Sequence, residues 1–153
     1  PFFNYVGGTQ DAIYEMLKHP ATVSGLSDGG AHVRMICDAS IPTYVLSHWA
    51  RDRHRGPKLT IEEAVKVQTL DTAKVMGFDD RGQLAVGKKA DINIIDMNRI
   101  EVGRPHMAYD LPANGRRLVQ RAIGYASTFV AGVQTVDNDT FTGELPGKLV
   151  RGA

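Results

Sequence analysis

The chain has 153 residues, of which 42% are hydrophobic and 23% charged, and its formal net charge is +1. This composition is typical of a soluble globular protein with one ordinary core or parts of two, and the near-neutral charge predicts no nucleic-acid or membrane partner. The single cysteine, Cys37, excludes an intramolecular disulfide framework. We therefore expect a cytoplasmic protein, and no apolar stretch approaches the roughly 18 residues of a membrane span.

A short helix and a short strand are predicted near the start of the chain. Thr9 is placed to cap a helix from about Asp11 to Lys18, and Pro20 follows its end. Residues 22–26 are small or apolar on both faces. That pattern predicts a buried parallel strand.

A second helix is predicted from Ser40 or Ile41 to about Asp52, with Pro42 in its first turn. Its apolar stripe consists of Val45, Leu46 and Trp49. The basic cluster after it, residues 51–58, has no interleaved aromatic side chains. Cations at a helix C-terminus are ordinary partners of the helix dipole, so the cluster does not predict a nucleic-acid-binding site.

Two further helices are predicted before residue 78. Thr60 and Glu63 form a capping box, the clearest helix start in the chain. The expected buried face of this helix is Ile61, Ala64, Val65 and Gln68. Asp71 is placed to cap a shorter helix over about 72–76, which should stop at Gly77.

The pattern after Gly77 predicts an all-β region. Residues 81–84 and 90–95 are interpreted as short strands joined by a turn at 87–89, and 98–118 as a long irregular stretch. Residues 121–130 alternate as a strand does and lead through a turn at Ala131 and Gly132 into a strand over 133–136. A type I′ turn would force Ala131 to positive φ, so a turn of another kind is expected.

The chain therefore divides into residues 1–78 and 79–153. A lone parallel strand is not stable by itself, and a β/α barrel takes about 250 residues. The chain also starts at Pro1 rather than Met. We expect a fragment or a processed piece of a larger protein, whose helical half needs a missing upstream segment.

The most informative motif is residues 27–32, Ser-Asp-Gly-Gly-Ala-His, directly after the predicted strand. An ionisable Asp28 at the end of a barrel strand is typical of a catalytic position, and the glycines should allow a sharp turn with room for a ligand. The alternative is an ordinary turn aspartate. His32 is a candidate metal ligand or an orienting neighbour of Asp28, and a surface or core-edge histidine is equally compatible.

The ordered motifs resemble the C-terminal portion of D-aminoacylases (N-acyl-D-amino-acid deacylases), a branch of the amidohydrolase superfamily. The matching segments are His19-Pro20, Leu26–Gly29, Ser47–Asp52, Thr60–Val65, Ala73–Gly77, Arg81–Leu84, Gly87, Ala90–Ile92, Phe129–Gly132 and Thr142–Gly147. The resemblance implies an α/β fold: the last strand and helices of a TIM-like β/α barrel, followed by part of a small β-sandwich domain. By the same resemblance, Asp28 would occupy the position of the catalytic Asp.

The resemblance also implies a hydrolase that uses zinc or a similar divalent metal to cleave a small-molecule N-acyl amino acid. Asp28 would move protons during hydrolysis and is also a candidate metal ligand. The chain lacks the His-x-His pair of this superfamily, and its histidines are scattered. Most metal ligands are therefore expected outside this chain, which alone should be inactive.

Two alternatives remain beside a deacylase. The chain is an inactive fragment or split half, or it is a non-catalytic assembly module that self-associates through exposed apolar surface. His48 beside Trp49 is more typical of helix packing than of a ligand. Cys37 lies in an apolar neighbourhood and is interpreted as an inert thiol.

Overall fold

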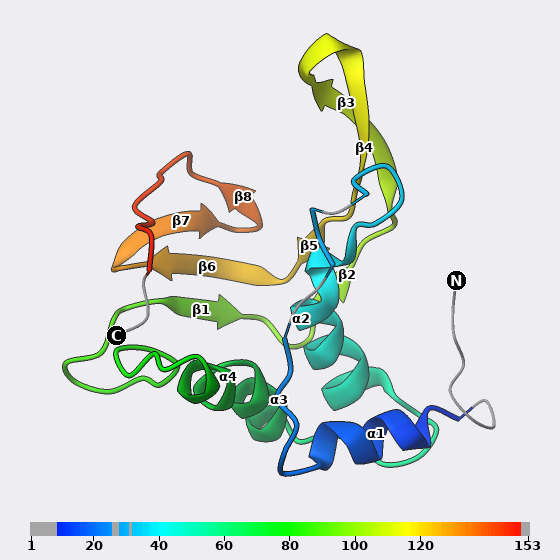
Figure 1. The fold of residues 1–153 in the computed structure, drawn as a ribbon, viewed down its shortest axis with the longest axis vertical. Helices are drawn as coiled ribbons and strands as arrows, with labels where there is room; N and C mark the ends of the chain where they lie inside the picture. Colours follow the sequence, from blue (N-terminus) through cyan, green and yellow to red (C-terminus); the bar gives the residue numbers. More distant parts are fainter. Residues whose placement is uncertain (1–8, 26–27, 31, 151–153) are drawn as a thin grey trace.

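The computed structural model describes residues 9–25, 28–30 and 32–150, with helices in the first half and antiparallel strands in the second (Figure 1). The helices are α1 (Asp11–Lys18), the 3-10 helix η1 (Asp38–Ser40), α2 (Ile41–Tyr44), the π-helix η2 (Val45–Asp52), α3 (Ile61–Gln68) and α4 (Leu70–Val75). No helix among these residues is long and apolar enough to cross a membrane.

The strands follow α4 after a stretch of turns. They are β1 (Ile92–Ile95), β2 (Glu101–Val102), β3 (His106–Leu111), β4 (Gly115–Val119), β5 (Ala122–Ile123), β6 (Tyr125–Val130), β7 (Val133–Asp137) and β8 (Thr140–Phe141), with the 3-10 turn η3 (Pro112–Asn114) between β3 and β4. One sheet has four antiparallel strands in the order β1-β6-β7-β8, and the pairs β2-β5 and β3-β4 form two smaller sheets.

The second helix is continuous in sequence but changes its winding along its length. The predicted span is covered by η1, α2 and η2, and it ends at Asp52 as expected. Val45, Leu46 and Trp49 are buried, which confirms the predicted apolar stripe. These residues form the centre of the hydrophobic core together with Leu59, Ala64 and Ile100.

The capping box at the start of α3 is present as predicted. The Glu63 backbone N–H donates to Thr60 Oγ1 at 3.1 Å, and the Thr60 N–H donates to Glu63 Oε2 at 2.9 Å. The predicted buried face is wrong in part, because Ile61 and Val65 are 46% and 43% exposed. Ala64 is buried as predicted, and the second buried residue of the helix is Val67, which the prediction did not include.

The helix α4 begins at Leu70, two residues before the predicted start. Its N-cap residue is Thr69, so Asp71 lies inside the first turn and is not the cap. There the Asp71 carboxylate forms an ion pair with Lys66 instead of capping the helix. The predicted stop is confirmed, since α4 ends at Val75 and Gly77 has a φ of 71°.

Three predictions about strands are wrong. Residues 22–25 form no strand, and Leu26 lies outside the described residues. No strand pairs with residues 22–25 in the described part of the chain, and the carbonyl of Ser24 accepts from Thr72 Oγ1 at 2.7 Å. Residues 81–84 form bends and turns, and the stretch 98–118, expected to be irregular, contains β2, β3 and most of β4.

The turn between β6 and β7 is a tight two-residue connection. Val130 pairs with Val133, and the two residues between them, Ala131 and Gly132, have φ values of 50° and 82°. Positive φ at both central positions is the pattern of a type I′ turn, so the expectation of another turn type is wrong. The Asp91 carboxylate accepts from the Ala131 N–H at 2.8 Å, which helps to hold this conformation.

Gly124 divides the predicted strand over 121–130 into β5 and β6. It has a φ of 101°, and a Cβ built on it would lie 2.5 Å from the Cα of Ile100. Only glycine accommodates both the backbone angle and this close approach. The β region is thereby packed directly against Ile100, the fully buried member of the core.

The mixed fold, with helices first and antiparallel strands after them, agrees with the expected α/β class. The change from helix to strand falls between Val75 and Ile92, and the division into two domains at residue 78 stays a prediction. The described strands form one four-stranded sheet and two two-stranded sheets. A sandwich and a barrel fragment therefore stay predictions.

Candidate functional site

Asp28 follows an extended segment that is anchored to α4. The Thr72 hydroxyl donates to the carbonyl of Ser24 at 2.7 Å, four residues before Asp28. The Asp28 side chain is exposed to solvent. The structure thus places the predicted catalytic carboxylate at an accessible turn after an anchored segment, not at the end of a strand.

The two glycines after Asp28 have different roles. Gly30 has a φ of 104°, so it supplies the sharp turn that the sequence predicts. Gly29 does not have positive φ, but a Cβ built on it would lie 3.2 Å from the Cβ of Ala39 and 3.3 Å from its backbone N. The space beside Gly29 is therefore filled by Ala39 and not left open for a ligand.

His32 has a backbone conformation that is uncommon for a residue with a side chain. Its φ is 45°, in the left-handed region. Its carbonyl accepts from the N–H groups of Met35 at 2.7 Å and Ile36 at 3.1 Å, which closes a turn. Strained backbone of this kind is concentrated at functional sites, and the exposed His32 side chain stays a candidate neighbour of Asp28.

The described residues do not form a complete metal centre. No group of three or more His, Cys, Asp or Glu side chains is placed to hold an ion within residues 9–25, 28–30 and 32–150. A structural zinc site takes four ligands and a catalytic site three, whereas Asp28 and His32 provide two candidates. The residues described here therefore do not fit a zinc site by themselves.

His48 is a packing residue, as its neighbour Trp49 suggests. Its ring stacks on Tyr44 at a centroid distance of 4.8 Å and meets Trp49 edge-on at 5.4 Å. Burial lowers the pKa of His48, and the positive charge of Arg53 acts in the same direction. A neutral imidazole packed between aromatic rings is typical of a packing residue and not of a metal ligand.

Arg53 carries a buried charge that no sequence pattern marks. Its side chain is 2% exposed, lies with its guanidinium 4.6 Å from the centre of the Trp49 ring, and pairs with Asp11 on α1. The guanidinium thus joins the end of η2 to the start of α1. In the sequence Arg53 lies in the same basic cluster as Arg51 and Arg55, and nothing in the local pattern separates it from them.

Gln120 is the second residue that sequence analysis missed. It lies between β4 and β5, and its side-chain oxygen accepts from the Ser40 hydroxyl. Its side-chain N–H donates to the carbonyl of Gly103 at 2.9 Å. No local pattern marks it, because all of its partners lie far away along the chain.

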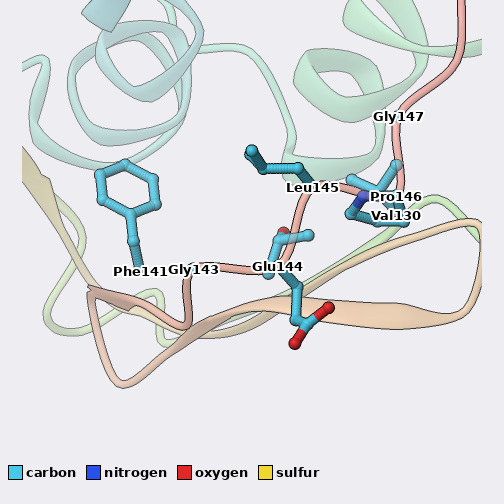
Figure 2. Close-up of a pocket in the computed structure, with 8 residues that line it drawn as sticks. Val130, Phe141, Gly143, Glu144, Leu145, Pro146 and Gly147 are labelled. Atoms are coloured by element: carbon cyan, nitrogen blue, oxygen red, sulfur yellow. The ribbon is translucent and has the colours of Figure 1, made fainter.

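An apolar pocket of about 320 Å³ lies between the four-stranded sheet and the C-terminal tail. Figure 2 shows Phe141 and Leu145 directed to one side of it and the carboxylate of Glu144 to the other. The lining residues are Val130, Thr135, Phe141, Gly143, Glu144, Leu145, Pro146 and Gly147. Neither Asp28 nor His32 contributes to it, so the pocket is separate from the candidate site.

The sequence matches the profile of the amidohydrolase family over residues 4–136. Among solved structures, a crystal structure of D-aminoacylase, described as defining a novel subset of amidohydrolases, is similar with 29% sequence identity and a TM-score of 0.48. The match covers 67% of this chain and 19% of that chain, so this chain spans about a fifth of the D-aminoacylase length. The comparison with curated proteins finds no match.

Proposed function

Because the chain belongs to the amidohydrolase family, we propose that it supplies the catalytic aspartate of an enzyme that hydrolyses N-acyl amino acids. The products would be a carboxylate and a free amino acid. The observation that carries this proposal is the exposed carboxylate of Asp28, held on a turn by Gly30 and by the contact of Gly29 with Ala39.

Amide hydrolysis needs a group that moves protons in both directions. A carboxylate within reach of the attacking water takes its proton and then passes it to the departing amine. Asp28 is accessible to both water and substrate because its side chain is exposed. The motifs around it resemble those of N-acyl-D-amino-acid deacylases, which makes an N-acyl-D-amino acid the proposed substrate class.

Zinc or a similar divalent metal would polarise the substrate carbonyl and acidify the attacking water in such an enzyme. The described residues do not assemble a metal site. We therefore propose that most ligands come from barrel strands outside this chain, with Asp28 and His32 at its margin. On this proposal the complete enzyme is this chain together with those strands, and the chain alone is inactive.

The test is the turnover of an Asp28→Asn variant of the complete enzyme on N-acyl amino acids. We expect kcat to fall at least about 100-fold, because asparagine cannot accept the proton. Asp38→Asn is the matched control, since Asp38 is also exposed and lies ten residues further along the same part of the chain. Near-normal turnover by Asp28→Asn would refute the role.

A second candidate is an assembly module without catalytic activity. It is favoured by the apolar side chains that α3 and α4 expose, including Val75 at 66% and Met76 at 58%. Exposed apolar surface of this kind promotes self-association. Light scattering that shows a monomer at micromolar concentration would contradict the assembly role. Metal-dependent deacylation by the pure chain would contradict the proposal that the chain alone is inactive.

A further inference from the structure

Gln120 connects three segments that are distant in the sequence. Its side-chain oxygen accepts from the hydroxyl of Ser40 and lies 4.0 Å from the sulfur of Cys37. Its amide N–H donates to the carbonyl of Gly103 at 2.9 Å. Both ends of the side-chain amide are therefore used, and the contacts are partly buried, where a lost hydrogen bond costs more than at the surface.

The edge of β4 makes a second contact with the same segment, defined here as residues 32–40. The Leu118 N–H donates to the carbonyl of Val33 at 2.7 Å. Leu118 is opposite Met107 in the β3–β4 pair, and its N–H is donated to the segment. The segment therefore lies along the edge of β4 (Figure 1) and is held there at both ends.

The segment in turn touches the turn that carries Asp28. Gly29 packs against Ala39 so closely that a Cβ on Gly29 would lie 3.2 Å from the Ala39 Cβ. Ala39 directly precedes Ser40, the residue that donates to Gln120. A continuous set of contacts thus runs from Gln120 through Ser40 and Ala39 to Gly29 and Asp28.

We propose that Gln120 is a positioning residue for Asp28: it holds Ser40, and with it Ala39, as the support against which the Asp28 turn is packed. This inference rests on the proposed function of Asp28. Residues 28–30 belong to no helix or strand of the described part of the chain, and the close contact of Gly29 with Ala39 supports the turn there. A displacement of about 1 Å from the productive geometry can reduce catalysis by about 100-fold.

Cys37 provides a direct report on this contact. It is the single cysteine of the chain and lies beside the Gln120 side chain. Burial raises the pKa of its thiol, and the Asp38 carboxylate acts in the same direction. Release of the segment from Gln120 should therefore make the thiol more accessible and more readily ionised, and both changes accelerate its reaction with a disulfide reagent.

The experiment compares Gln120→Ala with Gln134→Ala in the complete enzyme. Gln134 on β7 also uses its amide, donating to Ser127 Oγ at 3.3 Å and to the carbonyl of Val136 at 3.1 Å, so it is a matched control. We expect Gln120→Ala to label Cys37 with 5,5′-dithiobis(2-nitrobenzoate) at least about tenfold faster and to lower kcat at least about tenfold with KM unchanged. Gln134→Ala should change neither quantity.

Ser40→Ala is the second variant, and it keeps the test decisive if Gln120→Ala does not fold by circular dichroism. It removes only the hydroxyl that donates to Gln120. The variant that combines Gln120→Ala and Ser40→Ala should have the same kcat as the less active of the two single variants, because both substitutions interrupt the same contact. Unchanged labelling and unchanged kcat in Ser40→Ala would overturn the proposal.

The kinetics separate the two levels of the inference. If Asp28→Asn is inactive while Gln120→Ala and Ser40→Ala keep full kcat, the positioning role is wrong and the proposed function survives. If Asp28→Asn keeps normal turnover, the proposed function is wrong and the positioning role falls with it. A loss of kcat that accompanies faster Cys37 labelling supports both.

Discussion

The helical region, residues 11–76, is held together by buried side chains, whereas the β region, residues 92–141, is held mainly by paired backbone. The buried hydrophobic residues of the helical region are Val45, Leu46, Trp49, Leu59, Ala64, Val67 and Ala73. The β region contributes Ile100 alone to this set, and no described residue within a strand is buried. The four-stranded sheet is therefore held by its backbone hydrogen-bond ladder, which shifts register within β1 and β6, and its described strands contain no buried residue.

This difference makes the β region dependent on a few points of attachment to the helices. Ile100, against which Gly124 packs, belongs to the same hydrophobic core as the buried helical residues, and the Tyr125 hydroxyl is 2.7 Å from Thr43 Oγ1. The Arg51 guanidinium also donates to the carbonyl of Met97 at 2.9 Å. Losses at these contacts should destabilise the β region far more than losses elsewhere on its surface.

The largest expected effect is in the helical core. Trp49→Ala removes a 4%-exposed indole that also supports the Arg53 guanidinium, and it should lower the free energy of unfolding by about 4 kcal/mol. Phe141→Ala is the aromatic control from the β region; Phe141 is 70% exposed, so about 0.5 kcal/mol or less is expected. Urea unfolding followed by circular dichroism measures both, and equal losses would break the comparison.

The next effect tests the packing of Gly124 behind Ile100, the residue by which the β region joins the hydrophobic core of the helices. Gly124→Ala forces a side chain to positive φ and places its Cβ against the Ile100 backbone, so a loss of about 3 kcal/mol is expected. Gly147→Ala is the control, because a Cβ there would meet nothing within 4 Å. Thermal unfolding compares the two, and a neutral Gly124→Ala would show that the β region does not depend on this contact.

The smallest effect concerns the start of α3. Thr60→Ala removes the side-chain acceptor of the capping box and should cost about 1 kcal/mol. The other half of the box has a pH signature: the hydrogen bond from Lys18, then that from the Thr60 N–H, holds the pKa of Glu63 below its usual range.

The direction of this pH dependence follows from the lowered pKa. The stabilisation by ionised Glu63 is fully present above its usual pKa of 4.5 and is lost as the pH falls through its lower folded value. The difference in melting temperature between the wild type and Glu63→Gln should therefore shrink on acidification below about pH 4.5. A difference that stays constant from pH 7 to pH 3 would contradict the assignment.

Features with local causes could be predicted from the sequence, and features with distant causes could not. The capping box at Thr60 and the buried stripe around Trp49 depend on neighbours within one or two turns of helix. The β3–β4 hairpin escaped prediction because its strands are mostly exposed on both faces, so they lack the alternation of a half-buried strand. The need for glycine at position 124 could not be predicted, because it follows from the close approach of the Ile100 backbone in the folded chain.

In the candidate site, too, the features with local causes were predictable and those set by tertiary contacts were not. The motif around Asp28 predicts the candidate carboxylate, and the positive φ at Gly30 agrees with the predicted sharp turn. The role of Gly29 was misjudged, because Ala39 fills the space expected for a ligand and reaches it only through the fold. Gln120 has no sequence signal, since its partners Ser40 and Gly103 are brought to it by tertiary structure.

The most direct test of the account compares Asp28→Asn on two substrates that share an acyl group but differ in the leaving group. An amine leaves poorly unless it is protonated, whereas p-nitrophenolate leaves without a proton. We predict that kcat/KM for the N-acyl amino acid falls at least about 100-fold. The fold-loss in kcat/KM for the p-nitrophenyl ester should be at least about ten times smaller. Equal losses on the two substrates would contradict proton transfer from Asp28 to the leaving amine, and normal turnover of the amide would contradict any proton transfer by Asp28.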